Sequence, residues 1–157
     1  MVALQLILFC ALFTLMVKIG VGSSTLNGLY FYPEPVEKVY ELGLTDRETV
    51  ARKRKRFMIA FFAVMAAALV LIIRVWNGIQ DVGPAYLQAL IFLEVMNWYD
   101  GIVIDRLWVG HSRFWVIPGI EEIPFVQTWS QVLKKRGILT LIWIAGAAVI
   151  AGIVALL

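Results

Sequence analysis

Cysteine and histidine are nearly absent from this sequence, which has one of each among its 157 residues. A single cysteine, Cys10, cannot form a disulfide within one chain, and one cysteine with one histidine cannot complete a closed zinc site of those ligands. Charged residues are also scarce, at 16% against about 25% in a soluble domain. These absences exclude an intrachain disulfide, a zinc site built from those two residue types and an ordinary soluble domain.

Long hydrophobic runs are what the sequence has instead. Hydrophobic residues make up 61% of the chain, and a hydrocarbon core about 30 Å thick needs about 20 residues of helix to cross it. A window of that length finds four candidate spans, at residues 2–21, 57–76, 84–107 and 137–157. The sequence therefore predicts an all-α, four-helix transmembrane bundle that forms one integral membrane domain over residues 1–157.

Lysine and arginine are distributed unevenly between the segments that join these spans. Residues 22–56 hold seven of them and residues 108–136 hold four, while the turn at residues 77–83 holds none. Because basic residues near the ends of spans stay on the cytoplasmic side, both long loops are predicted to be cytoplasmic. Both termini are then expected outside the membrane.

The first predicted loop, residues 22–56, contains a short amphipathic helix. Pro33 and Pro35 are typical of the start of a helix, and the apolar side chains that follow, such as Val39 and Tyr40, share one side of it. We expect this helix to lie along the headgroup plane of the membrane. Gly43 is predicted to end it.

A second helix is predicted to start in the same loop, at a capping box of Thr45 and Glu48, and to continue without a break until Gly78. Its first turns carry a basic run, which we name by its residues: Arg52, Lys53, Arg54, Lys55 and Arg56. Each such charge attracts anionic headgroups by about 1 kcal/mol at a membrane surface. Nucleic acid is not an expected partner, because the chain has no folded basic domain with interleaved aromatic residues.

The third span is apolar except for a stripe of polar side chains. At about 100° per residue, Glu94, Asn97 and Asp105 fall on one helix face and Asp100 borders it. Glu94 lies near the predicted bilayer centre, where an ionised carboxylate costs at least about 2.5 kcal/mol. Either it fixes helix register by bonding Asn97 and a neighbouring helix, or it contacts a proton, cation or other ligand. The candidate partners on the other spans are Gln5, Thr14, Lys18, Arg74 and Thr140.

The stripe leads into a segment with further polar residues. His111 and Arg113 could engage an anionic or metal-linked group, or they could be interfacial residues that bond a carbonyl and lipid phosphates. Asp105, His111 and Glu121 could together hold a divalent cation. Their spacing matches no defined metal motif, and no other cofactor is indicated.

These residues predict a polar site on the third span that is open to the cytoplasm and that binds or passes a small cation, a proton or a lipid headgroup. The predicted site residues are Glu94, Asn97, Asp100, Asp105, His111 and Arg113. One alternative is a non-catalytic subunit or regulatory partner of a membrane complex, either a homo-oligomer or bound to a partner membrane protein. A third is a lipid-active enzyme with His111 and Asp105 as acid and base. A non-enzymatic role is favoured, because no activated nucleophile is visible.

Two blocks of the sequence resemble small, uncharacterised four-span integral membrane proteins of bacteria. One block runs from Glu94 to Glu122 and includes the Val103-Ile104-Asp105 and His111-Ser112-Arg113 segments. The other runs from Glu41 to Thr49. The resemblance implies a four-span fold in a bacterial cytoplasmic membrane and draws attention to the third span, but it carries no activity.

Overall fold

The computed structural model describes residues 1–30, 36–117, 119, 121 and 127–157, and all of its regular elements there are helices. Four helices are long and apolar enough to cross a membrane. They are α1 (Val2–Val21), α3 (Arg47–Val70) continued by η2 (Leu71–Trp76), α4 (Val82–Tyr99) continued by η3 (Asp100–Trp108) and α5 (Val109–His111), and α6 (Trp129–Leu156). The predicted all-α fold with four spanning helices is confirmed.

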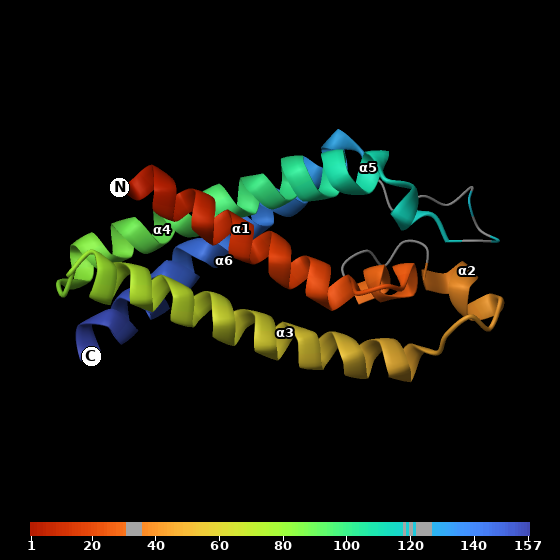
Figure 1. Ribbon diagram of the computed structural model, residues 1–157, viewed down its shortest axis with the longest axis horizontal. Coiled ribbons are helices and arrows are strands. Elements are labelled where there is room, and N and C mark those ends of the chain that lie inside the picture. Colours follow the sequence, from red (N-terminus) through yellow and green to blue (C-terminus); the bar gives the residue numbers. More distant parts are fainter. Residues whose placement is uncertain (31–35, 118, 120, 122–126) are drawn as a thin grey trace.

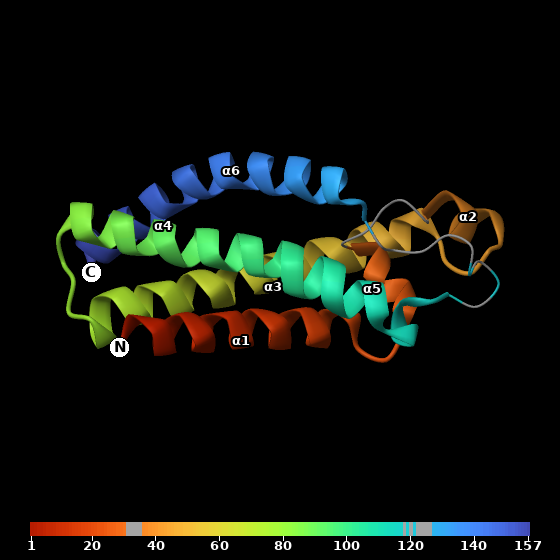
Figure 2. The same ribbon diagram turned by 90° about the horizontal axis from the view of Figure 1, so that it is seen from above.

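The four long helices lie roughly side by side and give the molecule two distinct ends (Figure 1). Both termini and the turn between η2 and α4 lie at one end, which we call the turn end. The other end carries the basic run of α3, the short helix α2 (Val36–Glu41) and α5, and we call it the basic end (Figure 1). α6 follows α4 along most of its length (Figure 2), and these two helices form the most extensive helix pair of the bundle.

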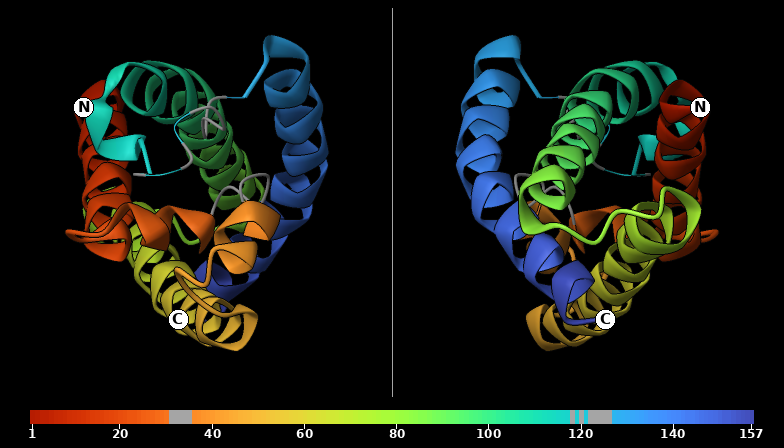
Figure 3. Two further views of the ribbon diagram at one scale, coloured as in Figure 1. Left: turned by 90° about the vertical axis from the view of Figure 1, so that its right-hand side faces the viewer. Right: turned by 90° about the vertical axis from the view of Figure 1, so that its left-hand side faces the viewer.

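Viewed along the bundle, α4 lies between α1 and α6, and α3 covers the open side of that row (Figure 3). Aromatic side chains fill the interior: Phe9 of α1 meets Phe92 of α4, and Phe13 of α1 meets Phe61 of α3, both edge to face with ring centres 5.6 Å apart. The outside of the bundle is also apolar. Val75 and Leu141, for example, are 72% and 69% exposed. An apolar surface around a packed apolar core is the arrangement expected of helices surrounded by lipid.

The second long helix begins as the sequence predicts, but with a different capping residue. Asp46 caps α3, because its carboxylate accepts a hydrogen bond of 2.7 Å from the backbone amide of Thr49. This hydrogen bond also lowers the pKa of Asp46. The predicted capping box of Thr45 and Glu48 is thus corrected by one position. From there the helix runs unbroken to Trp76, about 45 Å at 1.5 Å per residue.

The fourth long helix starts eight residues earlier than the predicted span at 137–157. A capping box begins it, in which the Thr128 hydroxyl accepts from the Gln131 amide and the Gln131 side chain accepts from the Thr128 amide. Lys134, Lys135 and Arg136 therefore belong to α6 and not to the predicted loop at residues 108–136. This correction decides the composition of the candidate site.

The segment before α3 contains the predicted short helix, α2. Val39 is fully buried against the bundle, and the guanidinium of Arg47 lies 5.2 Å from the centre of the Tyr40 ring. Gly43 has a φ of 67°, a conformation that suits glycine, and it ends the helix as expected. The predicted proline start at residues 33–35 lies outside the described residues.

Candidate functional site

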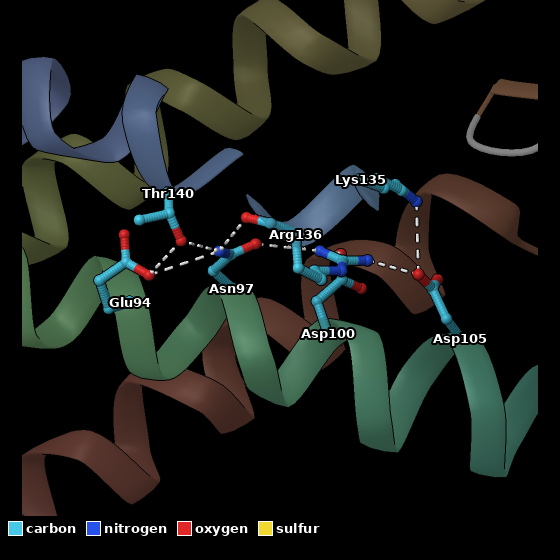
Figure 4. A network of polar contacts seen from close by, with 7 residues as sticks. All are labelled: Glu94, Asn97, Asp100, Asp105, Lys135, Arg136 and Thr140. Atoms are coloured by element: carbon cyan, nitrogen blue, oxygen red, sulfur yellow. Dashed lines mark hydrogen bonds and ion pairs between the residues drawn. The ribbon is translucent and has the colours of Figure 1, made fainter. Parts of the chain in front are cut away.

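Two aspartates of the third long helix lie on the same side because the helix changes its winding there. η3 is a π-helix, in which hydrogen bonds join residues five positions apart. In an α-helix Asp100 and Asp105 would be separated by about 140° around the axis. The wider π-turn brings them together, and both point toward α6 (Figure 4). An α-helical projection placed Asp100 only at the border of the polar stripe.

Arg136 of α6 is the residue that joins the two aspartates. Its Nη1 donates to Oδ2 of Asp100 over 2.7 Å, and its Nη2 donates to Oδ2 of Asp105. Arg136 and Asp105 are each 1% exposed. Lys135 adds a longer contact of 3.3 Å from Nζ to the same oxygen of Asp105 (Figure 4). Buried charges are costly unless they are paired, and here each buried charge has a partner of opposite sign.

Gly101 provides the room that Arg136 needs. A Cβ atom at Gly101 would lie 2.8 Å from Nε of the arginine, closer than such atoms approach in real structures, and 3.1 Å from its Cδ. Nε of Arg136 is buried against this position and has no hydrogen-bond partner among the described residues. The arginine therefore depends on the absence of a side chain at Gly101.

The inner end of the site is held by hydrogen bonds and not by ion pairs. Nδ2 of Asn97 donates to the Arg136 carbonyl over 3.1 Å, and the Thr140 hydroxyl donates to Oε2 of Glu94 over 2.8 Å. Thr140 was one of the candidate partners of Glu94, and this pairing is confirmed. Glu94 also lies 3.5 Å from Nδ2 of Asn97, so its contacts match the interpretation in which it fixes the register of two helices.

We call these side chains together the polar network. Its members are Glu94, Asn97, Asp100 and Asp105 from α4 and η3, with Lys135, Arg136 and Thr140 from α6 (Figure 4). The network extends along the helix pair from the middle of the bundle toward the basic end. Within the polar network, the Glu94–Asn97 contact lies inside α4, and the other hydrogen bonds described here join α4 or η3 to α6.

One side of the polar network borders a cavity of about 340 Å³, the interhelical cavity, in the half of the bundle nearer the basic end. All four long helices contribute to its wall. The polar part of the lining consists of Arg54, Asn97, Asp100, Asp105, Lys135 and Arg136. The apolar part consists of Phe13, Val17, Phe57, Met58, Phe61, Phe62, Met96, Ile104, Leu139, Ile142 and Trp143. The cavity is thus amphipathic, with a charged region on an otherwise apolar wall.

The charges on this wall do not balance. Asp100 and Asp105 are both bonded to Arg136, and Asp105 also to Lys135. Arg54 reaches the cavity from α3, is exposed, and forms no ion pair with the part of the chain that the structure describes. The lining therefore carries three cationic side chains and two carboxylates, both of which already have cationic partners.

The remaining predicted site residues do not join this cavity. His111 is exposed and its Nδ1 donates to the Leu107 carbonyl over 3.1 Å, which matches the interfacial interpretation of this residue. Arg113 is exposed as well. Glu121 accepts a hydrogen bond of 2.9 Å from the Gly119 amide, which holds the pKa of its carboxyl below the usual value.

The structure does not assemble the predicted cation ligands Asp105, His111 and Glu121. Within the described ranges, no group of three or more histidine, cysteine, aspartate or glutamate side chains is placed to hold a metal ion. Asp105 instead faces Arg136 and Lys135. The carboxylates of the third span are thus used in contacts between helices.

Sequence reasoning found the acidic half of the site and missed the basic half. Arg136 and Lys135 were counted as loop charges that set topology, and Arg54 as one member of the basic run. The available signal was the Thr128-x-x-Gln131 capping box, since a helix that starts there places Arg136 about 10 Å along it at 1.5 Å per residue.

No protein-family model, curated protein or solved structure matches the chain. The resemblance to four-span bacterial proteins therefore stays a prediction, and the function is inferred from the geometry of the polar network and the interhelical cavity.

Proposed function

We propose that this integral membrane protein binds a lipid-like amphiphile in the interhelical cavity. The observation that carries the proposal is the lining itself, in which a charged region and an apolar wall belong to one cavity. A polar headgroup would occupy the region of Asp100, Arg136 and Arg54. The apolar body of the same molecule would pack on aromatic side chains such as Phe61 and Trp143.

The paired carboxylates favour a lipid headgroup over the small cation and the proton that the sequence also predicts. A cation at Asp105 would have to displace Arg136, and removing one partner of a buried ion pair costs about 3–5 kcal/mol. Glu94 lies outside the described lining of the cavity and is bonded to Thr140. A headgroup can instead contact the cationic side chains without breaking either pair.

The size of the cavity fits part of such a molecule. Ligand pockets usually measure about 300–1,000 Å³, and this one measures about 340 Å³. A headgroup and the first part of a hydrocarbon chain would fill it, while the rest of the chain would stay in the bilayer. The site would therefore bind a molecule that is already in the membrane.

The proposal includes a location. With both termini outside a bacterial cytoplasmic membrane, the basic end of the bundle would lie at the cytoplasmic surface. The charged region of the cavity would then lie near the headgroups of the inner leaflet, and the basic run would contact anionic lipids beside it.

The lipid-active enzyme is not supported by the geometry. His111 is exposed and bonded to the Leu107 carbonyl, whereas Asp105 is buried and bonded to Arg136. The two side chains are thus used separately, and each has a structural partner. The non-catalytic subunit stays the rival proposal, and it predicts a second polypeptide where our proposal predicts a small amphiphile.

Native mass spectrometry on the protein extracted from its own membrane tests the proposal. We expect the wild type to carry an amphiphile. The informative variant is Leu139→Trp, because Leu139 lines the cavity and a tryptophan there would fill part of it. Leu141→Trp is the matched control, because Leu141 is on the same helix, 69% exposed and outside the lining.

The affinity for the amphiphile, read from the fraction of protein that carries it, should fall at least about tenfold in Leu139→Trp, a loss equivalent to about 1.4 kcal/mol. It should stay unchanged in Leu141→Trp. Circular dichroism of both variants checks that they fold. A wild type without a bound amphiphile, or equal occupancy in the two variants, would contradict the proposal. A stoichiometric second polypeptide would support the non-catalytic subunit.

A further inference from the structure

We infer that the amphiphile has a negatively charged headgroup and that Arg54 selects it. This inference rests on the proposed function and adds the class of ligand. It starts from the charge balance of the interhelical cavity, in which Asp100 and Asp105 already accept hydrogen bonds from Arg136. Arg54 adds a further positive charge from α3 that no described residue neutralises.

Arg54 lines two cavities of the protein. It lines the interhelical cavity, and it also lines a second cavity of about 400 Å³ whose lining includes Tyr40, Arg47 and Lys55. Met58 is the other residue shared by both linings. Lys55 places a further cationic side chain in the second lining, and an anion that enters the interhelical cavity would meet the Arg54 guanidinium at its polar region.

The chemistry of the side chain fits a phosphate or a carboxylate. A guanidinium presents its N–H groups in a planar fork that matches two oxygens of such a group. The guanidinium of Arg136 is already used for Asp100 and Asp105 on its two terminal nitrogens. Arg54 is therefore the guanidinium of the lining that can turn to the ligand without leaving a carboxylate unpaired.

The competing explanation is general attraction of anionic lipid to the basic run. Arg52, Lys53, Lys55 and Arg56 are exposed on the same turns of α3 as Arg54. General attraction would make these residues interchangeable, since it depends on net charge near the surface. Selection within the cavity would make Arg54 different from Arg52, which lines neither cavity.

The experiment compares wild type, Arg54→Gln and Arg52→Gln after reconstitution in vesicles of equal parts phosphatidylcholine and phosphatidylglycerol. Retained lipids are then counted by native mass spectrometry. We expect the wild type to retain phosphatidylglycerol in preference to phosphatidylcholine. The preference should fall about fivefold in Arg54→Gln, the ratio expected for one surface cation, and should be unchanged in Arg52→Gln. Both positions are exposed, so neither change should affect folding.

Equal retention of the two lipids by the wild type, or equal losses in the two variants, would overturn the inference. In the first case a lipid still binds and the proposed function stands, while the absence of any retained lipid would contradict both. A further arm adds glycerol phosphate to the vesicles. If this soluble anion removes the lipid at millimolar concentration, the site is one for a free phosphate compound, and the assignment to a membrane amphiphile is wrong.

Discussion

At the scale of single residues, the identity of Arg136 explains the polar network. It bonds Asp100 through Nη1 and Asp105 through Nη2, and a lysine has no second nitrogen with which to do this. Lys135, which is half-buried beside it, makes a longer contact of 3.3 Å to Asp105. The two adjacent cations therefore differ in role, because the arginine donates a hydrogen bond to each carboxylate from a separate nitrogen.

Gly101 allows a prediction in which packing and helix propensity act in opposite directions. Gly101→Ala should lower the free energy of unfolding by about 1–3 kcal/mol, as overpacking does, because the new Cβ would displace the Arg136 side chain. Propensity alone predicts a gain of about 0.5–1 kcal/mol for alanine in a helix. Denaturant unfolding in detergent micelles, followed by tryptophan fluorescence, measures the sign.

Gly137→Ala is the control for that prediction. Gly137 follows Arg136 in α6 and is exposed, and, apart from its chain neighbours and the nearby backbone of its own helix, no atom of the described residues lies within 4 Å of the position where a Cβ would be added. Its replacement should therefore show the gain from propensity. If both alanine variants are stabilised equally, Arg136 is not held against the backbone of η3 as described.

At the scale of elements, the π-helix η3 brings two residues five positions apart into one site. The sequence predicted the polar stripe from a uniform α-helical period, which located Glu94, Asn97 and Asp105 correctly on the face toward α6. It could not predict that Asp100 and Asp105 both bond to Arg136. A π-turn has no simple periodicity, and its extra residue changes the angle between side chains only locally.

The first and last residues of each helix show which signals in the sequence were sufficient to predict its limits. α1 matches the predicted span at residues 2–21, because the apolar run of the sequence stops at Gly22, whose φ of 58° ends the helix. The fourth helix was predicted to start at Gly137, since a hydropathy window rejects Lys134, Lys135 and Arg136. The capping box at Thr128 places them in the helix. Half of the site was missed for that reason, since Arg136 was assigned to a loop.

A deletion tests the role of η3. Removing Ile102, which is 44% exposed, should let the backbone return to α-helix. Asp100 and the second aspartate would then be four positions apart, or about 40° around the helix axis, and Arg136 could still reach both. Removing Leu87, which is 59% exposed in the regular part of α4, rotates one end of the helix by about 100° against the other.

We therefore expect the Ile102 deletion to give folded protein and the Leu87 deletion to give little or none. Size-exclusion chromatography in detergent and thermal melting by circular dichroism compare the two. Loss of folded protein in both deletions would mean that η3 is needed for more than the alignment of its two aspartates.

Across the bundle, charge and apolar surface are arranged along different directions. The apolar surface surrounds the bundle, while the basic run and Lys135 lie toward the basic end and the turn end carries Asp81. The interhelical cavity lies in the half of the bundle nearer the basic end. The orientation of the chain in the membrane therefore decides which leaflet could supply the proposed ligand.

Cysteine labelling tests this orientation, and the sequence makes it simple because Cys10 is the single cysteine and is buried. We expect Gln80→Cys, at the exposed turn end, to react with a membrane-impermeant maleimide on intact cells. Glu41→Cys, at the exposed end of α2, should react only after the membrane is permeabilised. The unchanged protein, with Cys10 alone, is the control for background labelling.

The reverse pattern of labelling would place the eleven basic residues of the two predicted cytoplasmic loops outside, against the distribution that normally sets topology. It would also move the polar region of the interhelical cavity to the outer leaflet. Arg54 would then lie away from the cytoplasmic leaflet, whose anionic lipids give that surface its negative potential. The expected pattern instead places Arg54 and Arg136 on the side where an anionic amphiphile is most abundant, so the labelling result fixes the leaflet in which the ligand must be sought.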